Sequence, residues 1–222
     1  MLLVHGAHLA GWCWLLVVEQ LARCGIPAHA VDLPFTGFLD DVRHVREAVA
    51  KRARRGPVHL VGHSYAGLVI AAAGHDASHL TFVAGRLPRP GESAAAGTDD
   101  WGFPEFRACM VADADGVVRL DPGARDLLYN RTDPALAQFA MDRARPMASL
   151  VPEEPIADPA WTSVPSSYVV CADDRAVRPD SQRERAALVS ASVELDTDHS
   201  PFFSGVRPLA GFLAAQHDRV AR

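Results

Sequence analysis

Short apolar runs alternate with longer amphipathic segments along the first 84 residues of the chain. The short runs cover residues 2–4, 28–31, 58–61 and 80–84, and a Gly or an Asp follows each within two residues. Runs of this length with little polar character are typical of strands that are covered on both faces of a sheet.

Residues 12–24, 40–54 and 66–74 predict helices between or after these strands. Apolar residues recur at helical spacing in the first two segments, at Trp14, Leu15, Val18 and Leu21 and at Val42, Val45, Ala48 and Val49. Strands at residues 167–171 and 193–195, with helices at residues 180–188 and 206–220, repeat the pattern near the C-terminus. This alternation predicts βαβ units and an α/β fold with a mostly parallel sheet flanked by helices.

Residues 86–165 interrupt the alternation. Nine of the sixteen prolines lie between Pro88 and Pro159. Nine aromatic or methionine side chains lie in the same region: Trp101, Phe103, Phe106, Met110, Tyr129, Phe139, Met141, Met147 and Trp161. Two helical pieces are predicted there, at residues 124–129 and 134–143, each beginning close to a proline. An insertion of this kind predicts a lid over a pocket. We expect about a third of the nine side chains to touch a ligand and the others to pack the lid onto the body.

The expected organisation is therefore an α/β core of residues 1–85 and 166–222 with a lid at residues 86–165. With 222 residues, of which 49% are hydrophobic, the chain is long enough to bury a substantial core. A net charge of −5 without a long basic run predicts no nucleic-acid partner and no anionic membrane surface. The basic cluster at residues 51–55 is interpreted as the solvated end of a helix, where cations suit the helix dipole.

No apolar run approaches the roughly 20 residues that a membrane span needs. The N-terminus shows no basic stretch with a cleavage site, so a cytoplasmic protein is expected. The four cysteines have no metal-ligand spacing and are expected to be reduced thiols: Cys13, Cys24, Cys109 and Cys171. Residues 130–132 match a glycosylation acceptor, which carries no weight without secretion.

The third short run leads into Gly62-His63-Ser64-Tyr65-Ala66, a small-x-Ser-x-small pattern. A serine between a buried strand and a helix lies on a sharp turn that exposes its hydroxyl at the helix N-terminus. The pattern is weak on its own. It makes Ser64 the candidate nucleophile, which the rest of the chain must support.

A serine hydroxyl needs a base within hydrogen-bond reach, and ligands of an open α/β sheet bind at the C-terminal ends of the strands. Of the ten histidines, His199 alone follows a late strand with suitable acids upstream, in the order Ser, Asp, His that such sheets use. The others near strands are interpreted as structural or exposed: His59, His63, His75 and His79. Candidates for the acid are Asp173, Asp174, Asp196 and Asp198, of which the last two lie too close to His199 in the sequence to turn back onto its ring.

When a serine attacks a carbonyl group, negative charge develops on the carbonyl oxygen, and backbone N–H donors are needed to stabilise it. The residue after the nucleophile supplies one, and a loop after an early strand supplies another. Tyr65 and Ala7 fit these two places.

Several segments together resemble one branch of the α/β-hydrolases, which contains plant methylesterases and hydroxynitrile lyases. The matching segments occur in the same order and span nearly the whole chain: Leu3-Val4-His5-Gly6-Ala7, Gly11-Trp12-Cys13-Trp14, Gly62-His63-Ser64-Tyr65, Leu87-Pro88-Arg89-Pro90-Gly91-Glu92-Ser93, Tyr168-Val169-Val170-Cys171 and Asp198-His199-Ser200-Pro201-Phe202. The resemblance implies the α/β-hydrolase fold, with roles in catalysis for Ser64 as nucleophile, His199 as base and Asp174, rather than Asp173, as acid. It also implies an oxyanion hole from Ala7 and Tyr65.

The chain departs from this branch at a few positions. Ala66 and Leu9 stand where relatives often have Gly and His. The cyanohydrin lyases of the branch tend to carry Thr where this chain has Gly6 and Lys where it has Ser200. These differences favour ester chemistry.

We therefore expect a serine hydrolase that cleaves a small, largely apolar carboxylic ester through an acyl-enzyme, with no cofactor and no metal. One alternative keeps the triad for lyase or elimination chemistry in secondary metabolism. A ligand receptor or partner-binding protein that keeps the fold without useful turnover is a second alternative. The expected partner is a small-molecule substrate, and the sequence leaves open whether the chain forms a homodimer.

Overall fold

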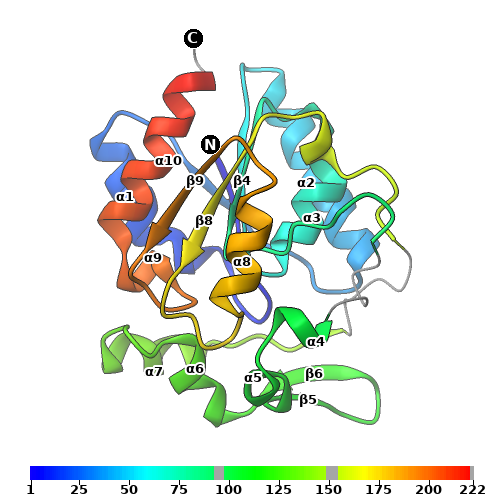
Figure 1. Ribbon diagram of the computed structural model, residues 1–222, viewed down its shortest axis with the longest axis vertical. Coiled ribbons are helices and arrows are strands. Elements are labelled where there is room, and N and C mark those ends of the chain that lie inside the picture. The colour runs from blue at the N-terminus through cyan, green and yellow to red at the C-terminus, as the bar shows by residue number, and fades with distance from the viewer. Residues whose placement is uncertain (93–97, 149–154, 221–222) are drawn as a thin grey trace.

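Six short strands form one parallel sheet in the computed structural model, which describes residues 1–92, 98–148 and 155–220 (Figure 1). The spatial order is β2-β1-β3-β4-β8-β9. The strands are β1 (Leu2–Val4), β2 (His29–Val31), β3 (His59–His63), β4 (His79–Val83), β8 (Ser166–Cys171) and β9 (Ala191–Leu195). In register, Gly62 of β3 pairs with Val4 of β1 and with Phe82 of β4. The predicted parallel α/β sheet is confirmed.

Helices cover both faces of this sheet, which explains why its strands are apolar throughout. The helices of the core are α1 (Leu15–Arg23), α2 (Phe38–Ala53), α3 (Ala66–Ala73), α8 (Pro179–Ala186) and α10 (Val206–Val220). Because successive strand residues point to opposite faces, Leu60 and Phe82 pack with α2 and α3, whereas Val61 and Val83 pack with α1 and α10. Figure 1 shows the sheet between these two helical layers.

The first helix differs from its prediction. Residues Gly11–Trp14 form a 3₁₀ turn, and the α-helix begins only at Leu15. Trp14, Val17 and Leu21 are buried, but Leu15, predicted to face the core, is 65% exposed. Trp14, Val17 and Leu21 have the spacing of one helix face, whereas Leu15 follows Trp14 by one residue and so points about 100° away from it.

The lid lies between β4 and β8 in the sequence and across the C-terminal edge of the sheet in space (Figure 1). Its helices are α4 (Thr98–Trp101), α5 (Pro104–Ala108), α6 (Arg125–Leu128) and α7 (Pro134–Asp142). The last two confirm the two predicted helical pieces. The lid packs onto the body through an apolar cluster in which Leu128 and Tyr129 meet Trp12, Ala176 and Phe203.

A small antiparallel sheet in the lid was not predicted. It consists of β5 (Met110–Ala112), β6 (Val117–Leu120) and β7 (Met147–Ala148). These strands have only two to four residues, which is too few for an apolar alternation to mark them. The available signal was the Asp115-Gly116 turn, where Gly116 adopts a φ of 77°. The division of the chain at residues 86 and 165 into two domains stays a prediction.

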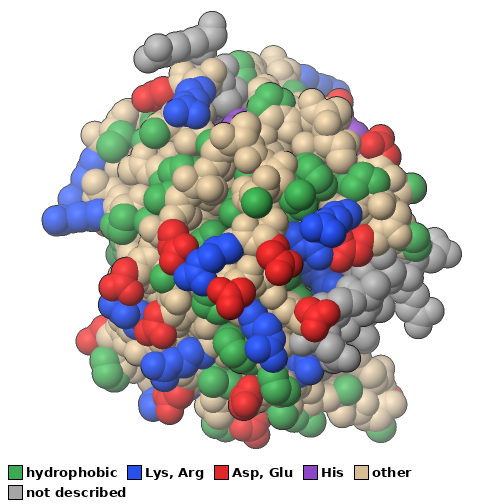
Figure 2. All heavy atoms as spheres, in the orientation of Figure 1, with side chains coloured by type: hydrophobic (Ala, Val, Ile, Leu, Met, Phe, Trp, Pro, Cys, Tyr) green, Lys and Arg blue, Asp and Glu red, His purple; other side chains and the backbone are tan. Residues whose placement is uncertain are grey.

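Charges of both signs are interspersed on the face shown in Figure 2. Among the described residues, no helix combines the length and the apolar character that crossing a membrane would require.

Candidate active site

Ser64 occupies the turn between β3 and α3 with a φ of 52°. A positive φ is uncommon for a residue other than glycine and stores backbone strain. The Ser64 N–H donates to the Val83 carbonyl at 3.0 Å, and the Ser64 carbonyl accepts from the N–H groups of Gly67 and Arg86 at 2.9 and 3.2 Å. The end of β4 therefore holds the strained turn in place, as the strand-turn-helix prediction requires.

Close backbone approach explains the small residues around this turn. A Cβ at Gly62 would lie 2.8 Å from the Ala66 carbonyl oxygen, and a Cβ at Gly6 would lie 2.6 Å from His63 Nδ1. Ala66, which replaces a frequent glycine, is fully buried, so its methyl group is accommodated. Gly67 packs against the Arg86 backbone so closely that a Cβ would overlap both the Arg86 nitrogen and the Arg86 carbonyl oxygen.

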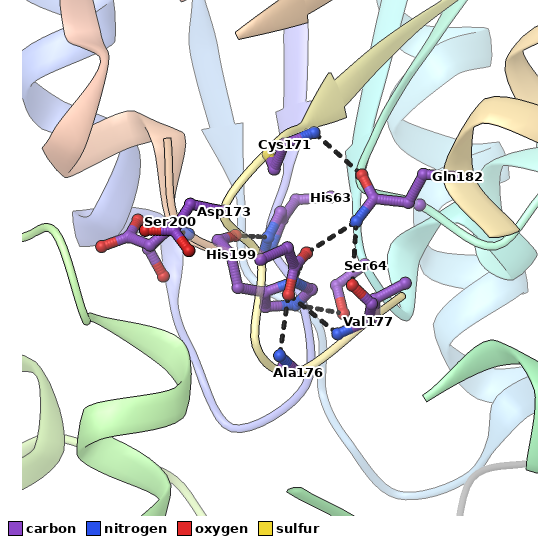
Figure 3. Close-up of polar contacts among 12 residues, drawn as sticks. His63, Ser64, Cys171, Asp173, Ala176, Val177, Gln182, His199 and Ser200 are labelled. Carbon is purple, nitrogen blue, oxygen red and sulfur yellow. Dashed lines mark hydrogen bonds and ion pairs between the residues drawn. The ribbon is translucent and has the colours of Figure 1, made fainter. Parts of the chain in front are cut away.

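The structure brings Ser64, His199 and Asp174 together from three separate loops at the edge of the sheet. Figure 3 shows Ser64 and His199 next to each other. His199 Nε2 lies 3.0 Å from Ser64 Oγ, and His199 Nδ1 lies 2.6 Å from Asp174 Oδ2. An ionised carboxylate only accepts, so Nδ1 carries the ring proton and Nε2 is left to accept from the serine hydroxyl. This is the arrangement of a nucleophile, its base and the group that orients the base.

The Asp174 carboxylate is buried, and four donors surround it. Oδ1 accepts from the N–H groups of Ala176 and Val177, each at 2.8 Å. Oδ2 accepts from His199 and from Gln182 Nε2, the latter at 2.8 Å. Figure 3 shows Gln182 reaching from α8 into this group. Hydrogen bonds of this number hold a buried carboxylate in one orientation.

The other candidate acids make different contacts. Asp173 accepts from Asn130 Nδ2 at 3.1 Å, and Asp196 accepts from Arg131 at 2.7 Å. Asp198 is buried and accepts from Thr132 Oγ1 at 2.8 Å. None of these three carboxylates bonds the His199 ring, which agrees with the expectation that Asp196 and Asp198 are too close to turn back.

His63 lies in the site, although it was not predicted to do so. Its Nε2 donates to the His199 carbonyl oxygen at 2.7 Å, and the two ring centroids lie 4.7 Å apart. Burial, followed by the nearby His199, lowers the pKa of His63 well below its usual value. A neutral His63 therefore supports the His199 loop without opposing a positive charge on the His199 ring. Its position directly before Ser64 was the only available signal.

His8 was also missed. It adopts a φ of 62°, and its Nδ1 donates to the Arg145 carbonyl oxygen at 2.9 Å. The ring is almost fully buried and lines the cavity beside Ser64. Burial lowers its pKa, so the ring is neutral near pH 7.

Ala7 and Tyr65, the predicted oxyanion donors, both line the cavity at Ser64. Among the described residues, no backbone hydrogen bond uses either N–H group. The Tyr65 hydroxyl donates to Asp41 Oδ2 at 2.8 Å, and Asp41 Oδ1 accepts from the Phe35 N–H at 3.0 Å. Burial and the Asp41 carboxylate raise the pKa of Tyr65, so the hydroxyl stays protonated and anchors the residue after Ser64.

The cavity at Ser64 has a narrow arm and a wide arm, which share Ala7, His8, Ser64 and Phe106. The narrow arm has a volume of about 40 Å³ and is lined by His199, Leu128 and Tyr129 among others. The wide arm has a volume of about 300 Å³ and a mainly apolar wall. Its lining includes Tyr65, Leu68, Arg86, Trp101, Arg107, Met110 and Met147.

Five of the nine large lid side chains line these arms: Trp101, Phe106, Met110, Tyr129 and Met147. Their number exceeds the predicted third, although contact with a ligand stays a prediction. Within the described parts of the chain, no group of three His, Cys, Asp or Glu residues is placed to hold a metal ion. All four cysteines are unpaired, as the sequence predicted.

Comparison with known proteins places this fold and site in context. Residues 1–215 match the sequence profile of the alpha/beta hydrolase family. The chain is 28% identical to the alpha/beta hydrolase nvfD of Aspergillus novofumigatus, with 72% of each chain covered. It is 26% identical to methylesterase 2 of Arabidopsis thaliana, over 97% of this chain and 95% of the relative.

A pyrethroid hydrolase from Sphingobium faniae JZ-2 has the same fold, with a TM-score of 0.80 at 24% identity. That comparison covers 98% of this chain and 96% of the other. The match to the family profile extends over nearly all of the chain, from β1 into α10, and includes every loop of the site. The chain belongs to the alpha/beta hydrolase family.

Proposed function

We propose that this protein is a carboxylic ester hydrolase that uses Ser64 as nucleophile, His199 as base and Asp174 as the acid that orients His199. The observation that carries the proposal is the continuous hydrogen-bonded path from Ser64 Oγ through the His199 ring to Asp174. The strained turn at Ser64 supports it, because such strain is typical of functional positions.

The geometry supports a two-step mechanism. Ser64 Oγ attacks the ester carbonyl carbon while its proton passes to His199 Nε2, and the N–H groups of Ala7 and Tyr65 stabilise the resulting oxyanion. Collapse of this intermediate breaks the bond to the alcohol oxygen, which takes the proton from His199. A water then attacks the acyl carbon and gives one proton to His199. The second intermediate collapses as His199 returns this proton to Ser64 Oγ, which breaks the bond from Ser64 Oγ to the acyl carbon and releases the acid.

We assign the alcohol of the ester to the narrow arm and its acyl group to the wide arm. The leaving alcohol must lie beside His199 Nε2 to receive its proton, and His199 lines the narrow arm only. A volume of about 40 Å³ corresponds to roughly three water positions, which suits an alcohol of one or two carbons. The wide, mainly apolar arm then takes the acyl group. The proposed substrate is thus a short-alcohol ester of a larger, largely apolar acid.

The name of the Arabidopsis relative, a methylesterase, agrees with a small alcohol. The tomato methylketone synthase I has a similar fold, with a TM-score of 0.79 at 19% identity, and this similarity supports only the fold.

A fluorophosphonate probe tests the nucleophile directly. We expect stoichiometric labelling of Ser64 in the folded protein and none in Ser64→Ala. Methyl, ethyl, butyl and benzyl esters of one apolar acid test the substrate class, with kcat/KM expected to fall at least tenfold from methyl to butyl. Absence of labelling in the folded wild-type protein would overturn the covalent mechanism. Labelling without hydrolysis of any ester would indicate elimination or lyase chemistry at the same site.

A further inference from the structure

Residues 130–132, which follow α6 in the lid, contact both loops that carry the proposed acid and base. We refer to residues 130–132 as the clamp. Thr132 N donates to the Tyr129 carbonyl at 3.1 Å, which closes the clamp into a tight turn. Asp133 then caps α7 by accepting from the N–H groups of Ala135 and Leu136. The clamp is therefore a defined turn between two helices of the lid.

The first contact of the clamp is with Asp198, the residue directly before His199. The Asp198 side chain is fully buried, and its carboxylate accepts four hydrogen bonds. Oδ1 accepts from Ser200 N at 2.9 Å and from Ser204 Oγ at 2.6 Å. Ser200 directly follows His199, and Ser204 ends the short helix α9 (Pro201–Ser204). Oδ2 accepts from Arg131 N at 3.0 Å and Thr132 Oγ1 at 2.8 Å, both in the clamp. The lid thus supplies every donor to one oxygen of a buried carboxylate.

A buried carboxylate oxygen that loses its donors is strongly unfavourable. If the clamp withdrew, Asp198 would have to move toward water or toward new donors. Because Asp198 and His199 are joined by one peptide bond, such a shift would move the His199 ring. Displacements of about 1 Å at a reacting group cost on the order of 100-fold in rate.

The second contact of the clamp is with the loop of the proposed acid. Asn130 Nδ2 donates to the backbone oxygen and to Oδ2 of Asp173, both at 3.1 Å. The Arg131 guanidinium bridges Asp173 at 3.4 Å and Asp196 at 2.7 Å. These exposed ion pairs add little energy by themselves, but they orient the loop that continues into Asp174.

The clamp is also adjacent to the substrate cavity. Leu128 and Tyr129, which directly precede it, line the narrow arm at His199. A group that fills the narrow arm therefore presses on the residues next to the clamp.

From this geometry we propose that the clamp is a positioning element for the reaction, in which the Thr132–Asp198 hydrogen bond sets the place of His199 relative to Ser64. The clamp does not touch the reacting atoms. It makes the lid part of the machinery that aligns base and acid, in addition to forming a cavity wall. This inference rests on the proposed roles of Ser64, His199 and Asp174.

The test compares Thr132→Val, which keeps the side-chain shape but removes the hydroxyl, with Thr132→Ser, which keeps the hydroxyl. We expect Thr132→Val to lower both kcat on a methyl ester and the rate constant of fluorophosphonate labelling by about tenfold, with KM within twofold of the wild type. Thr132→Ser should stay within threefold of the wild type in both measurements. Rates are divided by the folded fraction from circular dichroism.

Thr81→Val is the matched control. Thr81 Oγ1 is also buried and bonds Ser167 at 2.8 Å and His59 at 2.7 Å, within the sheet. This variant should lose stability without losing turnover per folded molecule. If Thr132→Val behaved in the same way, the clamp would be a purely structural contact and the proposal would be wrong.

Asn130→Ala tests the acid side of the clamp and serves if Thr132→Val does not fold. We expect its labelling rate to fall about threefold at unchanged KM, and a wild-type rate would count against the proposal. Failure of the wild-type protein itself to label would refute the proposed function, which is a distinguishable outcome.

Discussion

Gln182 Nε2 donates to Asp174 Oδ2 at 2.8 Å, the same oxygen that accepts from His199 Nδ1 at 2.6 Å. The other end of the Gln182 amide is fixed, because Oε1 accepts from the Cys171 N–H at 2.9 Å. The side chain is fully buried on α8. The amide therefore ties the proposed acid to the last residue of β8 and limits how the carboxylate can rotate.

Gln182→Met should slow turnover by about tenfold while leaving KM within twofold. The substitution keeps the side-chain length but removes a donor to a buried carboxylate, a hydrogen bond of the charged class that is worth roughly 1.5–3 kcal/mol. Only part of that energy concerns the orientation of Asp174 during the reaction. Steady-state kinetics on a methyl ester measure the effect.

Gln138→Met is the control for that prediction, because Gln138 is exposed on the lid and its amide donates to Asp142 Oδ1, one turn further along α7. It should keep wild-type kinetics. A wild-type kcat in Gln182→Met would show that the Ala176 and Val177 N–H groups hold Asp174 without help.

The sequence is sufficient to predict which loops form this site. Apolar strand runs fix where each strand ends, and residues directly after strand ends of a parallel sheet must gather at one edge. Ser64, His199 and the pair of candidate acids could be found in this way. Gln182 could not, because it lies inside a polar helix eight residues from Asp174, and nothing in that helix marks one face as buried.

Only part of the lid could be predicted from the sequence. Helices α6 and α7 were predictable because prolines mark their starts, but the three-stranded lid sheet was not. Its strands are too short to show an apolar period, so the fold of that region depends on contacts with distant segments. Volumes of the two cavity arms likewise depend on side chains from many separate loops.

Gly67→Ala should strongly destabilise the protein. A Cβ at this position would lie 2.6 Å from the Arg86 nitrogen and still closer to the Arg86 carbonyl oxygen, so the backbone that follows β4 would have to move. Overpacking of this kind typically costs about 1–3 kcal/mol, and rigid backbone on both sides favours the upper end. Urea denaturation measures the loss.

Ala66→Gly, one residue away, is the comparison. It removes a buried methyl group at the start of α3 and should cost about 1 kcal/mol or less. Equal stability of Gly67→Ala and the wild type would contradict the close packing at this turn.

Acid should destabilise the protein below about pH 6.5 through its buried histidines. Burial lowers the pKa of His5 and His79 to about 4, and it lowers those of His59 and His63 well below the usual value. The unfolded chain then binds more protons than the folded chain between pH 6.5 and 4, so stability is complete above pH 6.5 and falls as the pH drops. Each histidine contributes a loss of up to about 2 kcal/mol between pH 6.5 and 5.

Urea denaturation at pH 7.5, 6 and 5 measures this slope. His79→Gln retains a donor toward Ser167, which His79 Nε2 contacts at 3.0 Å, but cannot titrate. Its slope should be shallower than that of the wild type. A stability that stays level from pH 7.5 to 5 would mean that the buried rings keep their usual pKa values.

Leu128→Ala should shift the preference for the alcohol part of the ester. Leu128 is nearly buried and lines the narrow arm but not the wide one, so its truncation adds room where the leaving alcohol is proposed to lie. One methylene group in an apolar pocket changes kcat/KM by roughly 10–200-fold, so the ratio of kcat/KM for butyl over methyl esters should rise at least tenfold.

Met110→Ala enlarges the wide arm only and should alter the preference for the acyl group, with the butyl-to-methyl ratio unchanged. Because loss of a buried leucine also costs stability, both variants are compared per mole of labelled Ser64. If Met110→Ala changed the alcohol preference and Leu128→Ala changed the acyl preference, the two arms would have to be assigned the other way round.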